Sequence, residues 1–168
     1  MGRRHFTLLV YKLPPQPTRL RIQVWRKLQA VGAVYLQDGV AALPSRADLD
    51  ENLKYVATSI QEMGGSALVL KATGMESWDS ELLVERFRKA ADARMLEMLK
   101  SIGAIDAAFP ESHSFESLAK VDEAVKRERI AYLKARRLNY FECDMEAQVE
   151  GRLKLLVSRV SEFVGGAK

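Results

Sequence analysis

The chain has 168 residues, 48% of them apolar, enough for one sizeable domain or a small domain with a helical extension, and this excludes a disordered chain. It has no apolar run of about 18 residues, and no small-residue cleavage site follows its basic N-terminus, so we expect neither a membrane span nor a signal peptide. The single cysteine, Cys143, excludes an internal disulfide and, with those absences, predicts a cytoplasmic protein.

The net charge of +4 is distributed unevenly along the chain. Residues 1–46 carry eight Lys or Arg and one acid, residues 47–111 carry seven bases and twelve acids, and residues 112–168 carry eleven bases and nine acids. A basic first quarter beside an acidic middle predicts a directed electrostatic face. The alternative is a mixed, solvated surface, because lysine and arginine are mostly exposed in any protein.

The first predicted element is a strand over residues 6–13, whose continuous apolar run at 8–10 predicts burial on both faces. Three prolines end it: Pro14, Pro15 and Pro17. A helix follows from Thr18, and Gly32 is suited to a left-handed C-cap. Its apolar stripe consists of Leu20, Val24, Leu28 and Val31. We expect Trp25 and Leu28 to belong to the core.

The second strand, residues 33–44, is interrupted by Asp38-Gly39. That pair favours either one strand bent by a bulge or a short hairpin. Ser45 then opens a capping box before a helix with apolar residues at helical spacing, which ends at Gly64-Gly65. A short strand follows at residues 66–72.

With the hairpin, this order predicts a ferredoxin-like split β-α-β arrangement, an antiparallel sheet with two helices on one face. The remaining periodicity is helical. It predicts three antiparallel helices, from about residue 79 to 102, from 118 to 133 and from 145 to 163, with a break from Gly103 to Ser114. The predicted class is therefore α+β, with a ferredoxin-like module at 1–74 and a helical region at 75–168.

Catalytic and metal-binding patterns are not visible, so we expect no enzyme, cofactor or metal. His5 and His113 have no motif partner, and Gly64-Gly65 ends a helix, so it is no phosphate loop. Cys143 precedes the last helix, whose dipole would lower the pKa of the thiol; an incidental thiol is the alternative. One acidic cluster complements the dipole of its helix: Asp48, Asp50 and Glu51.

The basic residues carry the functional signal. Arg3 and Arg4 suggest an arm, and the acid-free first helix carries four bases, Arg19, Arg21, Arg26 and Lys27. Such rows neutralise phosphates and bind DNA without reading bases. Paired arginines also bind oxyanions, for which Arg136 and Arg137 are candidates. Acidic residues interleaved in that later helix favour ordinary surface charge there.

The same residues carry a family resemblance that spans nearly the whole chain. The sequence is similar to the N-terminal domain of the chromate resistance protein ChrB. In the first half, the motifs are Leu8-Leu9-Val10-Tyr11-Lys12-Leu13-Pro14, Val24-Trp25-Arg26-Lys27-Leu28, Gly32-Ala33 and Leu36-Gln37-Asp38-Gly39-Val40 with Leu43-Pro44. In the second half they are Phe115 to Leu118, Arg136-Arg137 with Tyr140-Phe141, and Phe163-Val164.

The resemblance implies a cytoplasmic regulator that senses chromate and binds DNA, with a ferredoxin-like N-terminal module. Small CRISPR-associated nucleases with that fold carry an acidic residue near the end of the first strand, where this chain has Lys12, which argues against a metal nuclease. The resemblance covers a stand-alone N-terminal domain, and chromate sensing is in question without the family's C-terminal domain. Leu138-Asn139 stands where an Arg-Asp pair is expected.

Three functions remain open: a DNA-binding regulatory module, a domain that binds chromate or another oxyanion through Arg21, Arg26 or Arg137, and an interaction module that forms a homodimer. The candidate partners are accordingly DNA, an oxyanion and a second copy of the chain.

Overall fold

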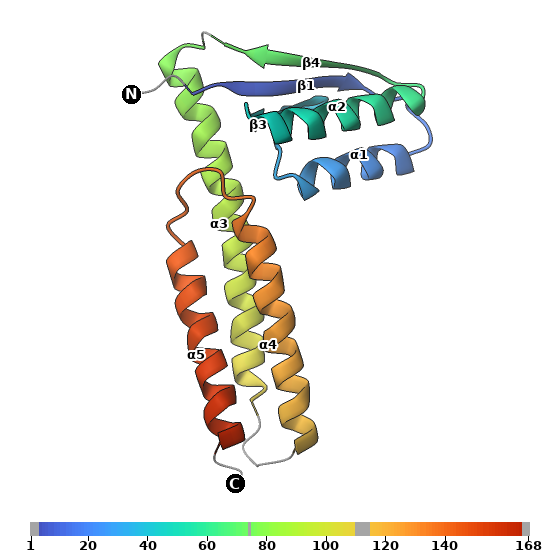
Figure 1. Ribbon diagram of the computed structural model, residues 1–168. Coiled ribbons are helices and arrows are strands. Elements are labelled where there is room, and N and C mark those ends of the chain that lie inside the picture. Colours follow the sequence, from blue (N-terminus) through green and yellow to red (C-terminus); the bar gives the residue numbers. More distant parts are fainter. Residues whose placement is uncertain (1–3, 74, 110–114, 166–168) are drawn as a thin grey trace. The chain divides into compact units, whose positions relative to one another are not determined.

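The computed structural model describes residues 4–73, 75–109 and 115–165 (Figure 1). The elements follow in the order β1 (Phe6–Lys12), α1 (Arg19–Ala30), β2 (Val34–Gln37), β3 (Val40–Pro44), α2 (Ala47–Glu62), β4 (Ser66–Ala72), α3 (Ser77–Ala107), α4 (Phe115–Arg136) and α5 (Glu146–Gly165). The α+β class is confirmed. None of the helices in these ranges is long and apolar enough to cross a membrane.

The chain divides into two compact units, Met1–Phe87 and Arg88–Lys168, and the division falls inside α3. The boundary between the two units, which we expected after residue 74, therefore lies further along the chain, after Phe87. The reason is that the first turns of α3 belong to the sheet unit, where Leu83 and Val84 are buried and the ring of Phe87 stacks on that of Phe6 with 6.1 Å between centroids.

The four strands form one antiparallel sheet in the order β2-β3-β1-β4. Asp38-Gly39 makes a hairpin turn between β2 and β3, so of the two alternatives the hairpin is found, with a register shift between Tyr35 and Gln37. The order of elements is thus β-α-β-β-α-β. The ferredoxin-like name stays a prediction.

Both α1 and α2 cover one face of the sheet (Figure 1). The expected burial of β1 on both faces holds at its start, where Phe6 and Thr7 are buried, but burial alternates further along, with Leu9 fully buried and Leu8 and Val10 only half-buried. The alternation arises because successive side chains of a strand point to opposite faces. Trp25 was wrongly assigned to the core, since 52% of it is exposed, whereas Leu28 is fully buried as predicted.

Both helices of the sheet unit end as the glycines predict. Gly32 and Gly64 adopt left-handed φ angles of 67° and 79°. The amide of Gly32 donates to Gln29 and that of Ala33 to Leu28. The end of α2 has the same two hydrogen bonds: the amide of Gly64 donates to the Gln61 carbonyl, and the amide of Gly65 donates to the Ile60 carbonyl. These are Schellman motifs, which satisfy the last carbonyls of a helix.

The predicted capping box at Ser45 is wrong. The N-cap of α2 is Arg46, in an extended conformation and without a side-chain cap. Ser45 cannot serve because its amide donates to the His5 carbonyl and continues the β1–β3 ladder. Its hydroxyl lies 3.2 Å from that of Thr7, which donates to the buried Asp50 carboxylate.

The second unit is a bundle of three helices, in which α4 runs antiparallel to α5 and to the second half of α3 (Figure 1). Its core includes Met95, Met98 and Ile102 of α3, Val121, Val125 and Tyr132 of α4, and Val149, Leu153, Leu156 and Val160 of α5. The break predicted from Gly103 to Ser114 begins later than expected, because α3 continues to Ala107, and residues 110–114 lie outside the described residues. A glycine inside a helix costs stability without ending it.

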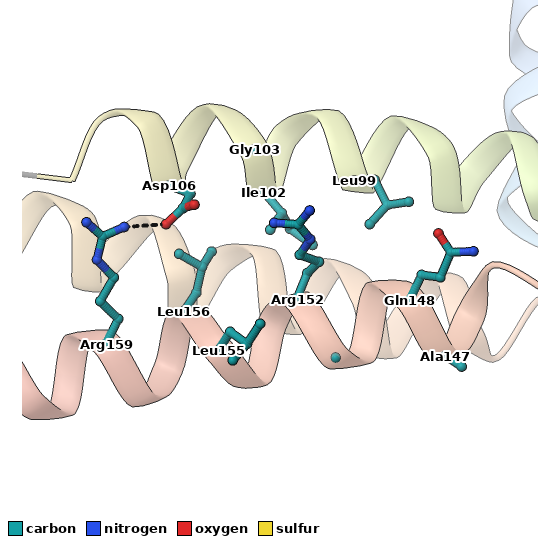
Figure 2. A pocket seen from close by; sticks show the side chains of 11 residues that line it. Leu99, Ile102, Gly103, Asp106, Ala147, Gln148, Arg152, Leu155, Leu156 and Arg159 are labelled. Atoms are coloured by element: carbon teal, nitrogen blue, oxygen red, sulfur yellow. Dashed lines mark hydrogen bonds and ion pairs between the residues drawn. The ribbon is translucent and has the colours of Figure 1, made fainter.

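A groove of about 540 Å³ runs between α3 and α5 beside Gly103 and Gly151. Figure 2 shows Arg152 and Gln148 reaching from α5 towards α3, and Arg159 of α5 pairing with Asp106. A Cβ atom added to either glycine would meet nothing within 4 Å. The glycines therefore leave space and are not required for close packing.

Replacing Gly103 or Gly151 by alanine is expected to raise the free energy of unfolding by about 1 kcal/mol each, because alanine loses less backbone entropy in a helix and meets no neighbour here. Urea unfolding of the full chain, followed by circular dichroism, measures this. A loss of stability in either variant would show that the space beside that glycine is filled.

Candidate nucleic-acid interface

The first helix of the sheet unit carries an unbalanced positive charge. It has four basic residues and no acidic residue, and its buried positions are Val24 and Leu28. Three of the bases, Arg19, Arg21 and Arg26, are exposed. In the part of the chain that the structure describes, no carboxylate pairs with any of the three.

These arginines lie on two adjoining faces of α1. Arg19 and Arg26 are seven residues apart and so share the outer face, together with Ile22, which is 45% exposed. Arg21 precedes Trp25 by four residues, so the two share a flank beside that face. The helix thus presents cations interspersed with exposed apolar and aromatic surface.

Lys27 has a different role from the three arginines. Its Nζ donates to Ser59 Oγ of α2 at 2.6 Å and lies 4.7 Å from the centroid of the Tyr55 ring. These contacts hold the ammonium group against α2, where the side chain is half-buried. Of the four residues of α1 predicted to contact DNA, Lys27 is therefore the one whose side chain connects α1 to α2.

A hollow of about 750 Å³ opens at the end of β1 beside Arg21 and Trp25. Its volume lies within the range of about 300–1,000 Å³ typical of small-molecule sites. The residues that line it come from β1, the loop after it, α1, β2 and the hairpin turn: Tyr11, Lys12, Leu13, Pro15, Arg21, Trp25, Tyr35, Asp38 and Gly39.

Two phenols meet at this hollow. The hydroxyls of Tyr11 and Tyr35 lie 3.1 Å apart in a hydrogen bond. Burial, and then the hydrogen bond with Tyr11, raise the pKa of Tyr35 well above its ordinary value. The Tyr35 phenol therefore stays neutral across the physiological range, and the pair offers one hydroxyl proton that is not used between them.

Two glycines bring main chain close to the end of β1. Gly39 has a φ of +75°, and its carbonyl accepts from the Tyr11 amide at 2.7 Å. A Cβ atom on Gly39 would collide with the Tyr11 carbonyl oxygen, and one on Gly65 would lie 2.6 Å from that of Lys12. Gly39, which lines the hollow, therefore cannot carry a side chain without moving the hairpin turn, and Gly65 fixes the main chain beside Lys12.

The chain matches the family model described as "Protein ChrB, N-terminal" over residues 21–165. It belongs to this family. Membership links the protein to chromate resistance. The match includes Trp25 of α1 and Asp38-Gly39 of the hairpin turn, which line the hollow. The strand β1 lies before the matched residues. Neither a curated protein nor a solved structure matches the chain.

The predicted arm of this ChrB-family chain is separated from the hollow. Arg4 is exposed and precedes β1, at the opposite end of the strand from Lys12. Arg3 lies outside the described residues. Sequence reasoning used Lys12 only as an argument against a nuclease, and it missed the contribution of Tyr11, Tyr35 and Trp25 to the site. The spacing of Arg21 and Trp25 on one flank was the available signal.

The predicted oxyanion pair lies at the end of α4 in the second unit. Arg136 pairs through Nε with Glu146 Oε1 at 2.8 Å and lines a hollow between α4 and α5. Arg137 is exposed and does not line that hollow. Asn139, where the ChrB resemblance leads us to expect a charged pair, accepts from Arg94 and donates to Glu146.

Cys143 does not have the lowered pKa expected near a helix N-terminus. Burial raises the pKa of the thiol, and its hydrogen bond to Asp92 Oδ1, at 3.2 Å, raises it further. Backbone hydrogen bonds near the start of α5 oppose these effects without outweighing them.

Alkylation of Cys143 by iodoacetamide is therefore expected to be slow, with a rate that still increases with pH above about 8.5, the ordinary thiol value. Asp92→Asn removes the carboxylate that disfavours the thiolate, so the rate near pH 8 should rise several-fold. Mass spectrometry measures the labelling, and Cys143→Ser gives the background. An unchanged rate in Asp92→Asn would contradict the role of that carboxylate.

Proposed function

We propose that this ChrB-family chain is a DNA-binding regulatory module of chromate resistance that acts in the cytoplasm and has no catalytic role. The outer face of α1 and the flank beside it would contact the DNA backbone. The observation that supports the proposal is the set of exposed arginines on an acid-free helix, Arg19, Arg21 and Arg26, without carboxylate partners in the described residues.

Arginines in this setting favour phosphate contacts for a physical reason. Each guanidinium that reaches a phosphate releases condensed counterions from the duplex, which drives binding at low salt. An arginine already paired to a carboxylate would first have to break that pair. Lys27, which is held by Ser59, fixes α1 to α2, so the helix would present its arginines from a rigid support.

The salt dependence of DNA binding tests this proposal. Fluorescence anisotropy with the protein's own upstream DNA, and with a random duplex of equal length, is measured between about 50 and 200 mM salt. Three phosphate contacts predict that the logarithm of the binding constant falls with the logarithm of salt concentration with a slope of about −2.7 or steeper. No binding to either duplex at low salt would overturn the proposal.

Oxyanion binding at the hollow beside Arg21 is a second candidate function. It is favoured by the arrangement of Lys12, Arg21 and the Tyr11–Tyr35 pair around one opening. Asp38 in the same lining opposes it. Calorimetric titrations with chromate and with sulfate test it, and no heat of binding for either anion would remove it.

A second copy of the chain also remains a proposed partner. The edge strand β4 supports it, because Leu68 and Leu70 are 63% and 48% exposed there. Exposed apolar edge strands favour pairing with another chain. Multi-angle light scattering over a range of concentrations checks it.

A further inference from the structure

We propose that the hollow between α4 and α5 is a binding site for an amphiphilic organic anion, a molecule with an oxyanion head group on an apolar body. The hollow has a volume of about 490 Å³, in the range of small-molecule sites. All its lining residues belong to the second unit, and none belongs to the α1 surface. The inference therefore does not depend on the proposed DNA binding.

One residue that lines this hollow has a buried hydroxyl without a hydrogen-bond partner. Tyr132 is only 5% exposed, and in the described part of the chain its hydroxyl makes no hydrogen bond. The Glu150 carboxylate is near enough for the hydroxyl to contribute to lowering the Glu150 pKa, but the two do not complete a bond. An unpaired buried donor is costly, so an acceptor supplied by a ligand would be favourable here.

Three cations surround the same hollow: Arg129, Arg136 and Lys154. Arg136 uses Nε for Glu146, and Lys154 pairs with Glu150 at 2.9 Å. Arg129 has no carboxylate partner among the residues that the structure describes. Because Glu150 is the one acid in the lining, the hollow is net positive and favours an anionic head group.

The rest of the wall is apolar, which determines the class of ligand. Leu133 and Val157 are 49% and 37% exposed, and Leu153 forms a buried part of the lining. An inorganic oxyanion would use the cations and leave this surface in water. An apolar body would cover it and gain about 25 cal/mol for each Å² removed from water.

Octanoate is the probe that tests the site. Amide chemical shifts of the full chain are followed as octanoate is added, and we expect saturable shifts confined to the lining segments of α4 and α5. Arg129→Gln and Tyr132→Phe should each weaken the affinity about tenfold, the effect of losing one hydrogen bond to a charged group. Arg127→Gln, an exposed arginine of α4 outside the lining, is the matched control and should change it less than twofold.

Tyr132→Phe also separates binding from folding. Removing an unpaired buried hydroxyl should leave the midpoint of urea unfolding unchanged or higher, so a lower octanoate affinity would not reflect a damaged fold. Three results would each overturn the proposal: shifts outside α4 and α5, equal affinities for octylammonium or sulfate, or an affinity that neither substitution lowers. DNA binding through α1 is measured separately and should be unaffected by both variants.

Discussion

Replacing Arg19, Arg21 and Arg26 together by glutamine is expected to lower the affinity for duplex DNA about a hundredfold near 100 mM salt. Glutamine keeps much of the side-chain length and removes the charge, so the loss reports phosphate contacts. The slope of the salt dependence should become shallower by about 2.7, because three counterion-releasing contacts are gone. Fluorescence anisotropy across a salt series gives both quantities in one experiment.

The control changes net charge equally elsewhere. Arg127, Arg137 and Arg152 are exposed, lie in the second unit, and have no carboxylate partner in the described ranges. Their triple glutamine variant should bind DNA within about twofold of the unchanged chain. An equal loss in both triple variants would show a response to total charge, and would contradict an interface on α1.

Replacing Gly39 by alanine is expected to lower the free energy of unfolding by about 3 kcal/mol. A left-handed φ of +75° costs an alanine about 1–2 kcal/mol, and the new Cβ would also collide with the Tyr11 carbonyl oxygen, which is main chain and cannot turn aside. The hairpin would have to move away from β1 and lose the bond between Tyr11 and Gly39. Urea unfolding followed by tryptophan fluorescence measures the change.

A second substitution separates the two causes. Asparagine tolerates the left-handed region better than alanine but still carries a Cβ atom. Gly39→Asn should therefore recover only the part of the loss that comes from backbone conformation. Gly103→Ala is the matched control, since the same chemical change there is expected to stabilise the chain. A neutral Gly39→Ala would contradict the close approach of the turn to β1.

Much of the fold follows from local rules in the sequence. Gly32 and Gly64 mark helix ends because a left-handed residue is needed there, and that need is set within one turn of helix. The capping box at Ser45 was predicted wrongly for the opposite reason, because the Ser45 amide donates to the His5 carbonyl across the sheet. That bond is long-range, and a local capping pattern does not reveal it. The helix end at Gly103 was predicted wrongly because packing in the three-helix bundle keeps α3 helical across a residue that favours helix poorly.

The candidate site also has one part that local sequence rules predict and another that depends on long-range contacts. The exposed arginines of α1 were predictable, since a basic residue away from an apolar stripe is solvated in nearly any fold. The hollow was not predictable, because it depends on residues 11, 21, 25 and 35 meeting through strand register. Trp25 shows the limit most clearly: it lies beside the buried stripe, yet 52% of it is exposed where it lines the hollow.

The close approach of Gly39 and Gly65 to the carbonyl groups of β1 has a consequence for how this site can diverge among relatives. Gly39 lines the hollow and packs against the main chain of β1 at a position that accepts no side chain, and Gly65 approaches Lys12 in the same way. Substitutions at Lys12, Arg21 or Asp38 can therefore change the charge that the hollow presents while its shape persists. A lineage can acquire a new ligand preference here one side chain at a time, whereas the loss of Gly39 would displace the hairpin turn that lines the hollow.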